Sequence, residues 1–182
     1  MAKEKIILGI DPGTNVMGFG ILSISNNKLS TLGLGAVHIK EKDHGLKLKI
    51  IFERTTSLIS QFQPDELAIE APFYGKNVQS MLKLGRAQGV AMAAALMRDI
   101  PIAEYSPRKI KQSITGNGAA SKEQVASMLK TLVNLETLPK DLDATDGLAV
   151  AICHYFQSTS KIPSSGKNDW SSFLRNNPDR IK

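Results

Sequence analysis

The sequence predicts an α/β protein in which one mixed five-stranded sheet carries helices on both faces. Three apolar stretches near the N-terminus are separated by short Gly and Asn turns, as in an antiparallel meander. A segment with helical spacing then separates the meander from another short apolar run, and further helical segments follow. Because a helix between two strands acts as a crossover, we expect the later strands to run parallel to an earlier one.

The predicted meander occupies residues 5–10, 16–24 and 29–39, with Asn26 and Asn27 at a hairpin tip. Its first strand ends in a carboxylate, because the stretch ILGIDPGT places Asp11 directly before a Pro-Gly turn. Asp is uncommon in strands, so this residue either caps the turn or has a chemical role.

The first crossover helix is predicted over 44–61, where apolar residues recur at helical spacing until Pro64 ends the pattern. The run ELAIEA at 66–71 is short and apolar and is closed by Pro72, which favours an extended residue before it. It is therefore predicted to be a buried strand that ends in a loop.

A long helix is predicted over 77–98, followed by a short strand at 101–104. Gly85, Gly89 and Ala93 recur at four-residue spacing along this helix and permit close approach of another element. Packing against the sheet is the expected explanation, and a dimer contact is the alternative.

Two capping patterns predict the next helices. Ser106 and Pro107 fit an N-cap and a first helical residue. Ser121 and Gln124 form a capping box for a helix that ends near Asn134.

The last core helix is predicted over 141–156. We therefore expect one domain over 1–157 and a linker and tail over 158–182. Trp170 and its apolar neighbours Phe173 and Leu174 indicate a small docking helix in the tail.

Composition indicates a soluble protein of a reducing compartment. Apolar residues make up 42% of the chain, which is sufficient for a core, and the single cysteine, Cys153, excludes a disulfide framework. The apolar run around Cys153 favours a place in the core. Neither a membrane-spanning segment nor a signal sequence is recognisable, so a cytoplasmic location is expected.

The net charge of +6 is unevenly distributed. Residues 75–130 contain 9 basic and 3 acidic side chains, whereas residues 131–157 contain 1 basic and 4 acidic ones. A basic region beside an acidic helix favours an anionic partner, although solvated helix faces explain the charge alone equally well.

Four carboxylates are candidates for an active site. Glu70 lies in a strand that should be buried, where a lone carboxylate is costly unless it is paired or bound to a cation. Asp143 and Asp146 are three residues apart at the start of a helix and share one face, although the helix dipole also favours acids there. If the first and fourth strands are neighbours, these residues converge with Asp11.

A cluster of carboxylate oxygens suits Mg²⁺ or Mn²⁺. Beside a basic region it predicts metal-assisted cleavage of a polyanion, for which two ions about 3.5 to 4 Å apart activate a water and stabilise the leaving oxygen. Zinc is disfavoured, because His38, His44 and His154 show no ligand spacing with Cys153.

The chain resembles the RuvC family of Holliday junction resolvases, which are nucleases of the RNase H-like superfamily. The resemblance extends over about residues 5–157 in the family's order and spacing. The matching segments are ILGIDPGTNVMGFG (7–20), FQPDELAIEAPFYGKNVQSMLKLGRAQGVA (62–91), EYSPRKIKQSITGNGAASKEQV (104–125) and DATDGLAVAICH (143–154).

The resemblance implies an RNase H-like fold and a homodimer that binds a four-way DNA junction. It implies symmetric metal-dependent nicking of two strands of like polarity during DNA recombination and repair, together with a branch-migration complex of the RuvA and RuvB type. The family's catalytic acids, which also bind the metal, map onto Asp11, Glu70, Asp143 and Asp146.

The resemblance also implies DNA contacts. The family's junction-contacting aromatic maps onto Phe73, and its DNA-binding lysines map onto Lys111 and Lys122. An aromatic on a loop beside a carboxylate can stack on an unpaired base, whereas a loop anchor packed into the core is the alternative. Further DNA-binding candidates on the chain are Lys76, Lys83 and Arg86, and then Arg108, Lys109 and Tyr74.

Three alternatives stay open. IDPGT followed by Gly18 is similar to the phosphate-binding hairpin of actin-like and sugar-kinase folds, although no second such hairpin is present. A non-catalytic junction-binding module would keep the fold without the chemistry. A related nuclease that cuts another substrate, such as an RNA–DNA hybrid, would use the same acids.

Overall fold

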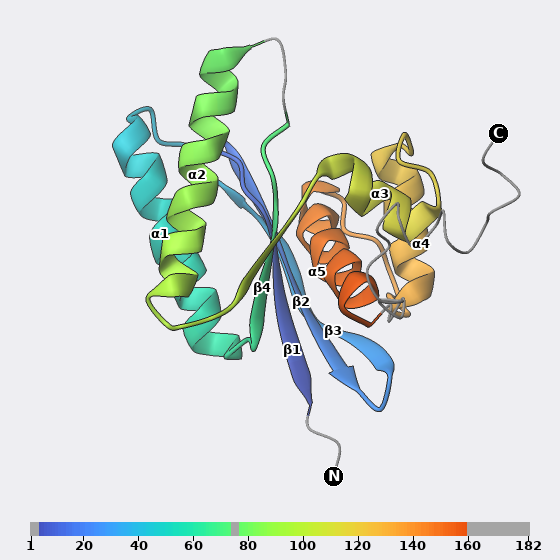
Figure 1. Cartoon of the computed structure of the whole chain (residues 1–182). Coiled ribbons are helices and arrows are strands. Elements are labelled where there is room, and N and C mark those ends of the chain that lie inside the picture. The colour runs from blue at the N-terminus through green and yellow to red at the C-terminus, as the bar shows by residue number, and fades with distance from the viewer. Residues whose placement is uncertain (1–3, 74–76, 160–182) are drawn as a thin grey trace, which may run out of the picture.

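The computed structural model describes residues 4–73 and 77–159, which form one sheet with a layer of helices on each face (Figure 1). The strand order is β3-β2-β1-β4-β5. The strands are β1 (Lys5–Asp11), β2 (Val16–Ser25), β3 (Lys28–His38), β4 (Glu66–Glu70) and β5 (Ile102–Tyr105). The helices are α1 (His44–Phe62), α2 (Val78–Leu96), α3 (Pro107–Thr115), α4 (Lys122–Leu132) and α5 (Asp143–Thr159).

The strand directions confirm the mixed sheet. β1 is antiparallel to β2, β2 is antiparallel to β3, and β4 runs parallel to both β1 and β5. Asn26 and Asn27 both adopt positive φ, 50° and 60°, in the hairpin between β2 and β3. This left-handed conformation is the one that tight hairpin turns require and that Asn tolerates.

The sheet is buried on both faces, because successive side chains of a strand point to opposite sides. Ile7 belongs to the core under α3, α4 and α5, and the adjacent Leu8 belongs to the core under α1 and α2. Cys153 is fully buried in the first of these cores, as expected from its apolar neighbours.

Helix α5 lies directly on the backbone of β1 and β2. A Cβ atom on Gly9 would be 2.1 Å from the carbonyl oxygen of Gly147, and one on Gly20 would be 2.4 Å from the Cα of Leu148. Likewise, a Cβ on Gly147 would be 2.4 Å from the Cα of Phe19. Only glycine permits this approach, and it brings the first turn of α5 to the end of β1.

The expected packing of Gly85, Gly89 and Ala93 against the sheet is wrong. A Cβ added to Gly85 or Gly89 would meet no atom within 4 Å, and Ala93 is exposed. The core face of α2 instead contains Ala87 and Ala91. Because small residues occur on both faces of this helix, spacing alone did not identify the buried one.

The capping predictions are confirmed. The Ser106 side chain caps α3 with Pro107 in the first turn, and Ser121 and Gln124 form both hydrogen bonds of a capping box. None of the helices in the described ranges is long and apolar enough to cross a membrane.

Helix α5 differs from its prediction at both ends. It begins at Asp143, two residues later than expected, and continues to Thr159, so that the expected linker start at 158 is still helical. The tail prediction, including the docking helix near Trp170, lies outside the described residues.

Candidate active site

Two of the predicted acids lie on neighbouring strands. Because β1 and β4 are parallel and Ile10 pairs with Ile69, the next residues, Asp11 and Glu70, end the two strands side by side. Both are partly buried. Gln88 of α2, a buried polar residue, donates from Nε2 to the backbone oxygen of Glu70 at 3.4 Å and supports the end of this strand.

The other two acids are contributed by α5. A Cβ on Gly18 would lie 2.3 Å from the carbonyl oxygen of Asp143, and Gly18 is the pairing partner of Asp11 on β2. Asp146 follows in the same turn of the helix. The structure therefore brings all four predicted carboxylates to the same end of the sheet.

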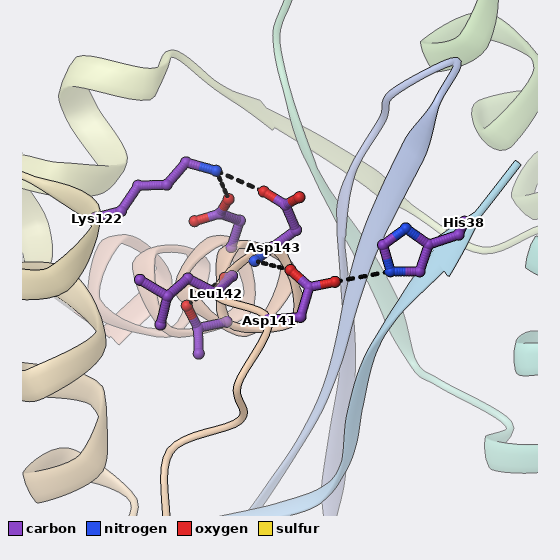
Figure 2. A network of polar contacts seen from close by, with 7 residues as sticks. His38, Lys122, Asp141, Leu142 and Asp143 are labelled. Atoms are coloured by element: carbon purple, nitrogen blue, oxygen red, sulfur yellow. Dashed lines mark hydrogen bonds and ion pairs between the residues drawn. The ribbon is translucent and has the colours of Figure 1, made fainter.

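Lys122 joins the two acids of α5. Its Nζ lies 2.6 Å from Oδ1 of Asp143 and 2.6 Å from Oδ2 of Asp146, as the dashed lines in Figure 2 show for the labelled pair. Burial lowers the pKa of Lys122, but the hydrogen bonds to the two carboxylates raise it by more than burial lowers it. The pKa of Lys122 is therefore above its usual value. The ammonium group thus supplies positive charge to an otherwise acidic site.

The remaining carboxylates hold their protons unusually tightly. Burial, followed by the charge of Asp146, raises the pKa of Asp11 to about 6. Burial, followed by the charge of Asp11, raises the pKa of Glu70 to about 8. Burial and, second to it, repulsion between the carboxylates thus disfavour their ionised forms, and a further cation among them would favour those forms.

The start of α5 is fixed by residues that sequence reasoning did not assign to the site. Oδ1 of Asp141 accepts from the backbone N–H of Asp143 at 3.1 Å, and Oδ2 of Asp141 lies 2.8 Å from Nε2 of His38 (Figure 2). Asp141 lies two residues before the first residue of α5, and an acid just before a predicted helix is typical of a cap, which is a usable signal for Asp141. No local signal links Asp141 to His38, because the two residues are 103 positions apart.

The donor set fits a hard divalent cation, since all four side chains offer oxygen atoms and three of them, Asp11, Glu70 and Asp146, have raised pKa values. Within residues 4–73 and 77–159, no three His, Cys, Asp or Glu side chains are gathered into a ready ligand set. The Lys122 ammonium instead bridges two of the acids. Loading of a metal therefore requires rearrangement of these side chains.

A second group of candidates lines a cleft beside the acids. Phe73 is 69% exposed, so the alternative that it anchors the loop in the core is wrong. Together with Lys111 and Arg108 it lines a cleft of about 470 Å³, which we call the Phe73 cleft. Phe73 follows Glu70 by three residues, so this cleft opens next to the carboxylates.

The other basic residues that were DNA-binding candidates lie on different helices. Lys83 and Arg86 are exposed on α2, where Arg86 borders an apolar cleft with Leu82. Lys109 is exposed on α3. Tyr74 and Lys76 lie outside the described residues.

The raised pKa of Glu70 predicts that the stability of the fold depends on pH. A carboxyl whose folded pKa, about 8, exceeds its usual value of 4.5 keeps a proton that the unfolded chain has lost. Metal-free protein should therefore lose stability as the pH rises from about 4.5 to about 8, by on the order of 5 kcal/mol at roughly 1.4 kcal/mol per pKa unit. Glu70→Gln should remove most of this loss.

Urea unfolding in EDTA at about pH 5 and about pH 8 measures the effect. Glu53→Gln is the control, because Glu53 is an exposed acid of α1 that pairs with Lys49 at 3.7 Å. Equal pH dependence in wild type and Glu70→Gln would contradict the raised pKa.

Known proteins share both sequence and fold with this chain. A family model described as "Crossover junction endodeoxyribonuclease RuvC" matches residues 7–154. Relatives of the same name from Christiangramia forsetii and Porphyromonas gingivalis are 57% and 55% identical, over 100% and 99% of this chain and 95% and 98% of their own lengths.

Solved structures agree. Thermus thermophilus RuvC in complex with Holliday junction substrate gives a TM-score of 0.78 at 28% identity, with 85% of this chain and 94% of that chain covered. The yeast mitochondrial Holliday junction resolvase, at 14% identity and a TM-score of 0.61, shares the fold over 82% of this chain and 77% of its own. The RNase H-like fold expected from the motifs is confirmed, and the chain belongs to the RuvC family of crossover junction endodeoxyribonucleases.

Proposed function

We propose that this protein is a structure-selective endonuclease that resolves Holliday junctions by nicking two strands of like polarity. Its membership of the RuvC family supports the reaction class. The observation that carries the proposal for this chain is the position of its acids. Asp11 and Glu70 end adjacent strands, the acids of α5 lie above them, and the exposed Phe73 stands three residues away from Glu70.

Family membership implies dependence on a divalent metal ion. We propose that Mg²⁺ is used, that Mn²⁺ can replace it, and that two ions are held by Asp11, Glu70, Asp143 and Asp146. When bound, such ions supply positive charge for the attacking water and for the leaving oxygen of the phosphodiester. The raised pKa values of Asp11 and Glu70 support this assignment, because a bound cation favours the ionised forms.

The neighbouring residues orient the DNA. In this proposal Phe73 stacks on an unpaired base at the crossover, and Lys111, in the same cleft, holds a backbone phosphate. Lys122 changes partners: it leaves the acids of α5 when the metal is loaded and contacts a phosphate. Lys83 and Arg86, both exposed on α2, add positive charge that attracts DNA.

A cleavage assay tests the proposal. Labelled four-way junctions, linear duplex and RNA–DNA hybrid are offered in Mg²⁺, and we expect the junction to be cut fastest, with paired nicks in strands of like polarity. Faster cleavage of the hybrid would support the related-nuclease alternative. Junction binding without cleavage in either Mg²⁺ or Mn²⁺ would support a non-catalytic module.

We propose that the functional unit is a homodimer formed through α2. Its exposed face carries the large apolar residues Val78, Leu82 and Leu96, with the small residues Gly85, Gly89 and Ala93 between them. Their spacing of three and four residues makes one continuous apolar stripe, which suits contact with a second helix. Two copies would supply the two active sites that paired nicking needs.

Leu82→Arg should therefore convert a dimer into a monomer in analytical ultracentrifugation, because it places a charge in the apolar stripe. Met128→Arg is the control, since Met128 is similarly exposed, 42% against 47% for Leu82, but lies on α4. A wild type that sediments as a monomer, or a dimer that Leu82→Arg leaves intact, would refute this interface.

Further elements of the proposal follow from the bacterial relatives. We propose action in the bacterial cytoplasm during DNA recombination and repair, with a branch-migration complex of the RuvA and RuvB type as partner.

A further inference from the structure

A basic cleft lies beside the loop that follows Asp11. Its volume is about 370 Å³, and its walls come from that loop, the start of α1 and the first turns of α2. Three lysines from separate segments line it: Lys42 just before α1, Lys47 within α1 and Lys83 on α2. We call it the α1–α2 cleft.

The positive charge of this cleft is not balanced. Among the described residues, no Asp or Glu lines it, and none of its three lysines forms an ion pair. Two acids, Glu41 and Asp43, flank Lys42 in the sequence, but neither lines the cleft, and Asp43 uses Oδ1 to accept the backbone N–H of Leu46 and so caps α1. Ammonium groups gathered on a concave surface attract anions.

The cleft also contains hydrogen-bonding groups that suit phosphate. The imidazole of His44 lines it, and the Nε2 atom is buried without a hydrogen-bond partner, which is unusual for a polar atom. Ser80 adds a hydroxyl group. Lys47 donates to Oδ1 of Asn15 at 2.6 Å and thereby fixes the loop that leads back to Asp11.

The position of the cleft relates it to the acids. Thr14 lines the cleft and is three residues from Asp11. Three residues span at most about 10 Å, so the cleft lies within a few nucleotides of the acids along a bound strand. The Phe73 cleft lies under α3, on the other face of the sheet, so the carboxylates stand between two basic clefts.

We infer that the α1–α2 cleft binds backbone phosphates of the substrate strand, two or three nucleotides from the bond that is cut and on the opposite side from the Phe73 cleft. The inference rests on the proposed function, since it extends the DNA footprint of the same active site. The contacts are to phosphate oxygens, so they position the strand and do not read its sequence.

Two double variants test the cleft. Lys42→Gln with Lys83→Gln removes two charges from the cleft, and within the part of the chain that the structure describes neither lysine forms a hydrogen bond or an ion pair with another side chain whose loss would disturb the fold. Lys28→Gln with Lys49→Gln is the matched control: Lys28 starts β3 at the far end of the sheet, and Lys49 pairs with Glu53 on α1. All four lysines are exposed.

Junction affinity is measured by fluorescence anisotropy in EDTA over a series of salt concentrations. The negative slope of log affinity against log salt should become less steep by about 1.8 in the cleft variant, at about 0.9 per phosphate contact, and should be unchanged in the control. Equal slopes in the two variants would overturn the inference.

Single methylphosphonate substitutions then locate the contact. Neutral linkages two or three nucleotides from the cut, on one side, should weaken binding by wild type and have no further effect on the cleft variant. Equal sensitivity of both proteins at these positions would refute the cleft as the site. Failure of the proposed function is distinguishable, because wild type would then bind the junction no more tightly than duplex.

Discussion

Asp11→Asn and Glu70→Gln are each expected to reduce junction cleavage by about 10²-fold to 10³-fold, since a comparable loss follows removal of a single electrostatic group from other active sites. Each substitution keeps the size of the side chain and removes one negative charge from the proposed metal site. Junction affinity should stay within about threefold of wild type, because phosphate contacts are made mainly by basic side chains.

Single-turnover cleavage and anisotropy on the same junction separate the two effects. Glu53→Gln is the control. Because Glu53 is exposed on α1, the protein with this substitution should cut junctions normally. Both site variants should also be more stable than wild type in EDTA at about pH 8, because they remove carboxylates that repel one another. Normal cleavage by Asp11→Asn would refute the proposed active site.

Gly9→Ala and Gly20→Ala should each lower the free energy of unfolding by about 3 kcal/mol or more, the upper end of the cost of overpacking. The added methyl groups would lie 2.1 and 2.4 Å from backbone atoms of α5. A backbone cannot move aside as a flexible side chain can, so the helix would have to lift from the sheet.

Urea unfolding at a fixed protein concentration measures this loss, because a dimer's apparent stability depends on concentration. Gly33→Ala is the matched control within the same sheet. Its Cβ would be 3.5 Å from Cζ of Phe62, an ordinary contact, so little change is expected. Equal stability of Gly9→Ala and Gly33→Ala would show that α5 does not approach the strands this closely.

Much of the fold was predictable because local patterns and topology agreed. The hairpin at Asn26 and Asn27, the cap at Ser106 and the capping box at Ser121 each depend on residues close in sequence. The convergence of Asp11 and Glu70 followed from a single rule, that a crossover helix returns a strand parallel to its neighbour.

The remainder depended on contacts that leave no local pattern. The glycines under α5 are spread over β1, β2 and the helix itself, so no periodic spacing revealed them, whereas the regular stripe at Gly85 and Gly89 faces outward. The pairing of His38 with Asp141 is likewise a product of tertiary structure. Lys122 was expected to contact DNA, and its bridge between two acids required a view of α4 beside α5.

The order in which α5 enters the chain has a consequence for protein synthesis. Asp143 and Asp146 belong to the last helix of the described domain, yet they complete a site whose other acids lie at the ends of β1 and β4. A ribosome produces the chain from its N-terminus. A nascent chain therefore carries only half of the proposed acids until its final helix emerges, so the site is assembled only when synthesis of the domain is complete.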